Sequence, residues 1–158
     1  MKSLKSYTVV LAAIIVTIGT ISVHADKSPS TNLNNFINVE SAPGQIVNQF
    51  HQAFETGDIK TLRSHLADDV LIFEGGVERS AESYASHHML EDIQYYTGIN
   101  STTLEHRVTI GVDLAVSISR SKHVGAYKSE AVNNINFETV ILRKVNDKWK
   151  ITHIHWSS

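Results

Sequence analysis

Cysteine is absent from this chain of 158 residues. Its absence excludes disulfide bonds, thiolate metal sites and a cysteine-linked lipid anchor. Basic residues are not in excess either, with 14 lysines and arginines against 16 acidic residues, which argues against a nucleic-acid partner. The sequence also lacks internal repeats, a nucleophile elbow, a phosphate-binding loop and a dinucleotide fingerprint. The chemistry of those motifs is therefore not expected.

A hydrophobic run long enough to span a membrane is missing as well. Lys2 and Lys5 are followed by an uncharged, largely apolar stretch over 7–21, shorter than the ~20 residues of a membrane helix. Val23-His24-Ala25 then places small side chains at the two positions that a signal peptidase reads. We expect residues 1–25 to be a cleaved signal peptide, with an uncleaved anchor as the alternative. The protein is then exported, periplasmic or secreted, with no membrane attachment after cleavage.

The remaining chain divides into a tether and one domain. Residues 26–40 are rich in serine, asparagine and lysine, which is typical of a flexible tether with at most one short docked segment. Residues 41–158 are long enough for a single modest core. Apolar residues at helical spacing predict three helices, over about 42–56, 59–66 and 81–96. Ser41, Asp58 and Ser80 are suited to cap their first turns.

Alternating apolar residues predict strands in the rest of the chain. A strand over 69–74 is followed by strands over 103–110, 114–127, 137–145 and 148–156. Breaks are expected at 111–113, at Asn133-Asn134 and at Asn146-Asp147. The last four strands therefore predict an antiparallel meander.

The final strand carries two histidines on the face that begins with Trp149 and Ile151. If Asn146-Asp147 is a two-residue turn, Val140 pairs with His153 and Glu138 pairs with His155. Cross-strand partners share a face, with Cβ atoms ~5 Å apart. We therefore expect Glu138, His153 and His155 to face one enclosed space together with His88.

Four motifs give the chain a family resemblance: Asp-Asp-Val-Leu-Ile-Phe-Glu-Gly-Gly at 68–76, His-His-Met-Leu-Glu-Asp at 87–92, Glu-Thr-Val-Ile-Leu-Arg-Lys at 138–144 and Trp-Lys-Ile-Thr-His-Ile-His-Trp-Ser at 149–157. With the order of helices and strands, they resemble the SnoaL-like branch of the nuclear transport factor 2-like superfamily over about 41–158. The resemblance implies an α+β fold in which a cone-shaped curved antiparallel sheet wraps around three amino-terminal helices. It also implies homodimers through the outer sheet face.

The resemblance does not imply one activity, because its members include isomerases, cyclases, dehydratases, assembly modules and binding domains. No residue-by-residue match to the carboxylate base and acidic donor pair of the isomerases is present. The site must therefore be argued from its own side chains. We expect the mouth of the cone to form a small-ligand pocket, with an aromatic and apolar wall and polar groups that orient the ligand. Its predicted ligand-binding residues are Glu74, Tyr84, His88, Glu138, Trp149, His153 and His155.

Acid–base catalysis is a second hypothesis for the same pocket. A histidine held by a carboxylate can transfer protons near neutral pH, and His155–Glu138 and His88–Asp92 are two such pairs. The reaction would be an isomerisation, a dehydration or a cyclisation of a carbonyl compound. No cofactor is expected for this chemistry.

Metal binding, a purely structural role and an interaction role also stay open. His153 and His155, with His88, are candidate ligands of Zn²⁺ or Cu²⁺ in an exported protein. The same side chains could instead form a buried polar network that only stabilises the last strand. Finally, Ile154 and Trp156 on the outer sheet face could make the domain an interaction module.

Overall fold

The computed structural model describes residues 34–158, which form one compact unit. Its elements are β1 (Phe36–Ile37), α1 (Ala42–Thr56), α2 (Ile59–His65), β2 (Leu66–Phe73), β3 (Val77–Glu78), α3 (Ala81–Ser86), α4 (Met89–Gly98), β4 (Ile99–Ile110), β5 (Leu114–Tyr127), β6 (Glu130–Val145) and β7 (Lys148–Ser157). The predicted signal peptide and most of the predicted tether lie outside the described residues. None of the helices within 34–158 is long and apolar enough to cross a bilayer.

The first two helices begin at the predicted residues. The Ser41 hydroxyl accepts a hydrogen bond from the Gly44 amide, and Gly57 ends α1 in the left-handed conformation with φ 69°. The Asp58 carboxylate caps α2 by accepting from the Thr61 amide at 3.0 Å. These local signals depend on neighbouring residues alone, which is why the sequence is sufficient to predict them.

The predicted third helix is two helices. His87 adopts φ −126° and ψ −81°, and this break separates α3 from α4. Its ring nitrogen Nδ1 donates to the Ser83 carbonyl at 3.0 Å, and that carbonyl is the one a continuing helix would offer to the His87 amide. The side chain thus competes with the next helical hydrogen bond, and the chain changes direction at His87.

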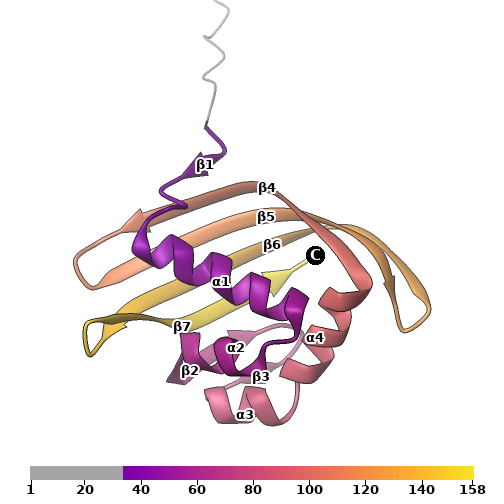
Figure 1. Ribbon diagram of the computed structural model, residues 1–158, viewed down its shortest axis with the longest axis horizontal. Coiled ribbons are helices and arrows are strands. Elements are labelled where there is room, and N and C mark those ends of the chain that lie inside the picture. Colours follow the sequence, from indigo (N-terminus) through magenta and orange to yellow (C-terminus); the bar gives the residue numbers. More distant parts are fainter. Residues whose placement is uncertain (1–33) are drawn as a thin grey trace, which may run out of the picture. The chain divides into compact units, whose positions relative to one another are not determined.

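A seven-stranded sheet in the order β1-β4-β5-β6-β7-β2-β3 curves around the helices (Figure 1). The central strands β4 to β7 form the predicted antiparallel meander. The sheet is mixed at its sides, because β1 pairs with β4 and β2 pairs with β7 in parallel. The predicted fold class, α+β with a cone-shaped curved sheet, is confirmed. The predicted break at Asn133-Asn134 is wrong, because β6 continues through both residues and the chain turns at Lys128-Ser129, each with positive φ.

The predicted register of the last hairpin is correct only as far as Ile151. Asn146 and Asp147 have φ 50° and 60°, so the two-residue turn forms and Leu142 pairs with Ile151. Thr152 is then an extra residue on β7, and the next pair is Ile141 with His153. This β-bulge moves every later side chain to the opposite face. The predicted pairs Val140–His153 and Glu138–His155 are therefore wrong, and Glu138 pairs with Trp156 instead.

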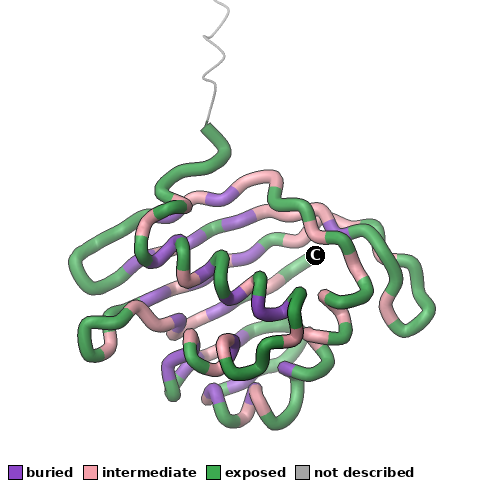
Figure 2. Tube along the Cα trace, in the orientation of Figure 1, coloured by how far each residue is buried: buried purple, intermediate pink, exposed green. Residues whose placement is uncertain are grey.

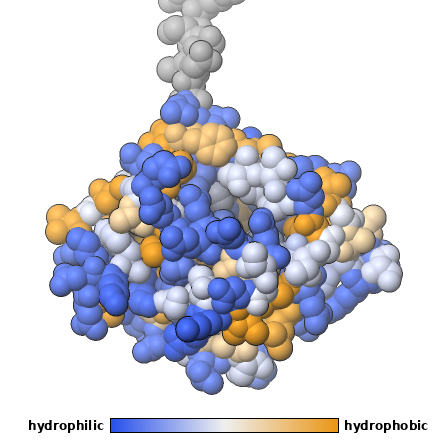
Figure 3. Space-filling model, viewed as in Figure 1, coloured by the Kyte–Doolittle hydropathy of each residue, from blue (hydrophilic) through white to orange (hydrophobic). Residues whose placement is uncertain are grey.

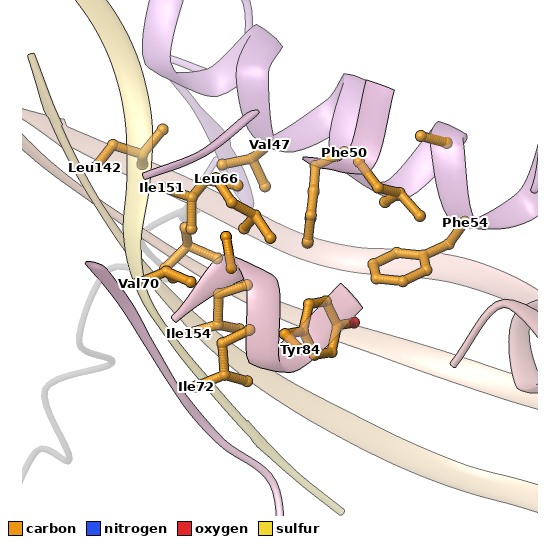
Figure 4. Close-up of a cluster of buried hydrophobic side chains, with 14 of the residues drawn as sticks. Val47, Phe50, Phe54, Leu66, Val70, Ile72, Tyr84, Leu142, Ile151 and Ile154 are labelled. Atoms are coloured by element: carbon orange, nitrogen blue, oxygen red, sulfur yellow. The ribbon is translucent and has the colours of Figure 1, made fainter. Parts of the chain in front are cut away.

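The hydrophobic core lies between α1 and the concave face of the sheet (Figures 2 and 4). Val47, Phe50 and Phe54 of α1 are fully buried, as are Ile151 and Ile154 of β7. Each such side chain contributes about 1.5–3 kcal/mol relative to an exposed one. Because both isoleucines must face the core, the bulge between them leaves His153 and His155 on the outer face.

Candidate active site

A cavity of about 830 Å³ opens where α3 and α4 face the ends of β5, β6 and β7. Its lining includes residues 156–158 at the end of the chain and residues of α4, and Figure 1 shows where the end of β7 and α4 lie in the fold. Hydrophilic side chains predominate over the helices on the face shown in Figure 3. The polar and aromatic residues that line the cavity are Glu74, Glu78, Tyr84, His88, Glu91, Asp92, Tyr95, Tyr96, Tyr127, Asn134, Asn136, Trp156, Ser157 and Ser158.

Two carboxyl groups and a buried phenol form the centre of the cavity wall. The Tyr84 hydroxyl donates to Asp92 Oδ2 at 2.6 Å. Burial raises the pKa of Asp92, although Tyr84 and His88 both oppose that rise. Loss of hydration raises the pKa of Glu74 to about 7, assisted by the negative charge of Asp92 and opposed by His88. Glu74 therefore exchanges a proton in the physiological range.

Beside them, His88 is held in place by Glu78. Its Nδ1 donates to Glu78 Oε1 at 2.5 Å, and the Ser83 hydroxyl donates to the other carboxylate oxygen. The hydrogen bond from Ser83 lowers the pKa of Glu78, and the contact with His88 lowers it further. Glu78 thus remains ionised and fixes the orientation of the imidazole at the cavity wall. The predicted partner of His88 is Asp92, which binds Tyr84 instead.

Two asparagines supply unsatisfied acceptors. Asn136 Nδ2 donates to His123 Nδ1 at 2.8 Å, and the Tyr95 hydroxyl is 3.0 Å from the same nitrogen. Burial lowers the pKa of His123, which favours the neutral ring, and its Nδ1 accepts the hydrogen bond from the Asn136 amide. The Oδ1 atoms of Asn134 and Asn136 are buried and have no partner among the described residues. Acceptors of this kind usually have partners in folded proteins.

A second, smaller hollow of about 70 Å³ lies between α1 and the sheet. Here His51 Nε2 is 2.8 Å from Glu138 Oε2, and Trp156 Nε1 donates to the same oxygen at 2.7 Å. Desolvation alone would lower the pKa of His51, but the Glu138 carboxylate raises it. Desolvation likewise acts to raise the pKa of Glu138, but the charge of His51 and its hydrogen bonds lower it. Each group therefore favours the charged form of the other.

Sequence reasoning misses His51, because a lone histidine on an amphipathic helix is typical of a surface position. One signal points to it, since His51 follows Val47 by one helical turn and so lies at the edge of the core stripe. Glu138 is predicted at the mouth of the cone and is instead buried beneath α1.

Of the predicted site residues, Glu74, Tyr84, His88 and Asp92 lie together at the cavity. His153 and His155 lie on the outer face beside Phe73, with ring centroids 5.2 and 6.4 Å from it. His153 Nδ1 donates to the Leu71 carbonyl at 2.8 Å. The expectation that both histidines share an enclosed space with His88 and Glu138 is therefore wrong, because the bulge at Thr152 turns them outward.

Trp149 also lies away from the cavity. It is near the β6–β7 turn, where Lys144 Nζ lies 5.3 Å from its ring centre. His155–Glu138 is not a pair, because Glu138 faces inward and His155 is exposed. Trp156, predicted on the outer face, is turned inward and packs against the core. Within residues 34–158 no three histidine or acidic side chains are arranged to hold a metal ion, so the predicted His88, His153 and His155 set does not come together.

With this fold and cavity established, the match to known families is decisive. The SnoaL-like domain family matches residues 44–158. The chain belongs to the SnoaL-like family. This places the protein within the nuclear transport factor 2-like superfamily, as its motifs predict.

Three solved structures illustrate the range of proteins similar to this SnoaL-like chain. A candidate ketosteroid isomerase from Shewanella frigidimarina is 45% identical, covers 77% of this chain and 99% of its own, and has a TM-score of 0.74. A candidate dehydratase of the nuclear transport factor 2-like family from Streptomyces avermitilis is 20% identical over 76% of this chain and 95% of its own, with a TM-score of 0.63. The association domain of CaMKII from C. elegans is 18% identical over 72% and 91%, with a TM-score of 0.58. No curated protein matches the sequence.

The last two of these similarities show the fold alone. A protein named as a dehydratase and an association domain share this architecture. Function must therefore be argued from the cavity of this chain.

Proposed function

We propose that this SnoaL-like domain binds a small molecule in the cavity beside α3 and α4. The observation that carries the proposal is the cavity itself, whose volume of about 830 Å³ falls in the range of ~300–1,000 Å³ typical of small-molecule sites. Aromatic rings and a few polar groups line such sites, and Tyr84, Tyr96, Trp156 and Glu74 provide both kinds of group here. The buried acceptors of Asn134 and Asn136 offer further polar contacts.

Native mass spectrometry of the protein purified from its own host tests this proposal. We expect a retained small molecule in the wild-type protein and none in Gly76→Trp, because Gly76 lines the cavity and has open space around it. Val112→Trp is the matched control, since Val112 is 82% exposed in the β4–β5 turn. Equal retention by Gly76→Trp would place the molecule elsewhere and contradict the proposal.

A second candidate function is acid–base catalysis on a carbonyl compound. Glu74, with a pKa raised to about 7, can accept and return a proton near neutral pH. Tyr84 and Asp92 form a hydrogen-bonded pair on the same wall, suited to orient a polar oxygen of the substrate. The 45% identity to a candidate ketosteroid isomerase favours the same chemistry.

An isomerase assay separates binding from catalysis. A β,γ-unsaturated ketosteroid becomes a conjugated enone when a proton moves from carbon to carbon, and the enone is followed by ultraviolet absorbance. If Glu74 transfers that proton, Glu74→Gln abolishes the turnover and Glu82→Gln in the first turn of α3 leaves it unchanged. Turnover that survives Glu74→Gln would exclude this role for Glu74.

The outer face of the sheet is the proposed dimer surface. Ile118 and Phe137 are 55% and 51% exposed, and Phe73 extends the same face. Cross-strand pairing also places Val116 beside Ile141, which continues the apolar band. A band of this kind is typical of a protein interface. A symmetric homodimer would cover it in both copies at once.

Export is proposed on the sequence of residues 1–25, which lie outside the described residues. Amino-terminal sequencing of the protein from its host is expected to begin at Asp26.

Binding of Zn²⁺ or Cu²⁺ is a separate proposal that now involves only His153 and His155 on the outer face. Metal titration of His153→Ala combined with His155→Ala tests it, and unchanged binding would rule these ligands out.

A further inference from the structure

We propose that the ligand of this cavity is a small organic cation, an amine carried on an aromatic or apolar body. This inference rests on the proposed function, because it assumes that the cavity is a ligand site. Three properties of the wall support it: the sign of its charges, its aromatic rings, and the kind of hydrogen-bonding atom that it leaves without a partner.

The charged groups on the wall are mainly acidic. Glu74, Glu78, Glu91 and Asp92 all line it, and no lysine or arginine among residues 34–158 does so. Glu91 is paired with Lys128 at 3.9 Å, so Glu74 and Asp92 are the carboxyl side chains on this wall without a basic partner among the described residues. His88 is the basic group that the described part of the chain places on this wall, and Glu78 already binds it. An anionic ligand would therefore meet like charges in a partly desolvated space, whereas a cation would be stabilised.

Aromatic rings surround these carboxyl groups. Tyr84, Tyr95, Tyr96, Tyr127 and Trp156 all line the cavity. Tyrosine and tryptophan attract cations over their ring faces, most strongly when the cation is desolvated. One of these rings already binds a cation, since Lys128 Nζ lies 4.9 Å from the centre of the Tyr127 ring. The wall thus combines carboxylates with rings in the manner of sites that bind ammonium groups.

The buried polar atoms of this wall that lack a partner are acceptors. The Oδ1 atoms of Asn134 and Asn136 are both buried and unpaired within the described structure. Three donors of the wall are already engaged, since the Tyr84 hydroxyl binds Asp92, the Asn136 amide nitrogen binds His123 and the Trp156 indole binds Glu138. A buried acceptor without a partner costs about 1–3 kcal/mol, and a ligand rich in N–H donors removes that cost. A primary ammonium group has three such donors.

Calorimetric titration with three indole compounds tests this inference, because the three share the same ring and differ in charge. Tryptamine is cationic, tryptophol is its neutral analogue and indole-3-acetate is anionic. At pH 8 we expect tryptamine to bind with a dissociation constant in the millimolar range or below and at least tenfold more tightly than tryptophol, and we expect no binding of indole-3-acetate. Binding of all three that is lost in Gly76→Trp but shows no preference for tryptamine would overturn the cation inference and support the pocket. If none of the three compounds binds, the result contradicts both the cation inference and the pocket.

Charge-removing variants identify the groups responsible. Glu74→Gln and Asp92→Asn are each expected to weaken tryptamine binding about tenfold and to leave tryptophol binding unchanged. Glu82→Gln, on α3 but outside the cavity wall, is the matched control and should bind both probes as the wild type does. Thermal unfolding of each variant confirms that it is folded. Undiminished tryptamine binding in both cavity variants would overturn the inference.

Discussion

Glu74 is the residue whose protonation state decides how the cavity behaves near neutral pH. Its pKa of about 7 reflects lost hydration first and the neighbouring charge of Asp92 second, with His88 acting in the opposite direction. Glu78 and Glu91 line the same wall, where they are paired with His88 and Lys128. The sequence indicates that Glu74 lies near the mouth of the cone. It cannot indicate the shifted pKa, because that depends on Asp92 and on burial.

An NMR titration of the glutamate carboxyl carbons measures the pKa of Glu74 directly. We expect the Glu74 midpoint near pH 7 and a lower midpoint in Asp92→Asn, because that substitution removes a negative charge that favours the protonated form. Glu82→Gln is the control and should leave the midpoint in place. A Glu74 midpoint near the ordinary glutamate value would show that the cavity does not desolvate this group.

The His51–Glu138 pair should contribute to stability over a defined pH window. The pKa of His51 is raised, so its contribution is complete below about 6.5 and is lost as the pH rises through the folded value. The pKa of Glu138 is lowered, so its contribution is present above about 4.5 and is lost as the pH falls. The pair therefore stabilises the fold most between about pH 4.5 and 6.5.

The variant His51→Ala tests that window by denaturant unfolding at pH 5.5 and pH 8.5. We expect a loss of about 2 kcal/mol at pH 5.5, because the buried Glu138 loses its charged partner, and a smaller loss at pH 8.5. His155→Ala, on the exposed outer face, should change stability by less than about 0.5 kcal/mol. An equal loss for His51→Ala at both pH values would mean that the pair is not charged.

At the level of elements, one residue in β7 separates what the sequence can predict from what it cannot. The alternation over 148–156 correctly predicts a strand, and Asn146-Asp147 correctly predicts its turn. Nothing local marks Thr152 as a bulge, because the bulge forms to keep both Ile151 and Ile154 in the core. The burial of these two isoleucines therefore decides on which face of the sheet His153, His155 and Trp156 lie.

Deletion of Thr152 should be strongly destabilising. Without the extra residue, regular alternation would turn the fully buried Ile154 outward and bring histidines toward the core. We expect a loss of at least about 3 kcal/mol in urea unfolding, the upper value for exposing one large apolar side chain. Thr152→Ser keeps the residue count and the hydroxyl that donates to the Ile141 carbonyl, so it should remain close to wild type. A deletion variant of wild-type stability would contradict the role of the bulge.

The end of α4 approaches β5 so closely that a side chain does not fit. A Cβ atom on Gly98 would collide with the Ala126 carbonyl oxygen. Gly98→Ala should therefore cost about 1–3 kcal/mol of unfolding free energy, as overpacking against backbone does. Gly76→Ala is the matched control, because a Cβ atom on Gly76 would meet nothing within 4 Å, and it should change stability little. Equal stability of the two variants would show that α4 can move away from β5.

For the whole molecule, the central feature is a separation of two surfaces. The concave side holds the cavity and the His51–Glu138 pair, and the outer side carries the apolar band with His153 and His155. The family resemblance predicts the cone and the order of the strands, because these follow from the overall pattern of elements. It cannot predict which residues line the cavity, because that depends on the break at His87 and the bulge at Thr152.

The proposed homodimer gives a prediction at this scale. Light scattering after size-exclusion chromatography should show twice the mass of one chain, and Ile118→Glu should yield a folded monomer because its charge cannot be buried in the band. Val112→Glu, in the exposed β4–β5 turn, should remain dimeric. A wild-type monomer would contradict the proposed interface.

The most direct measurement of the central claim is an NMR titration of amide and indole N–H signals with tryptamine and tryptophol in turn. The cavity site predicts shifts of the Trp156 indole and of amides in 74–78 and 91–96, with no change at 111–113. Shifts confined to the outer-face residues, or no shift with either probe at millimolar concentration, would contradict a ligand site beside α3 and α4.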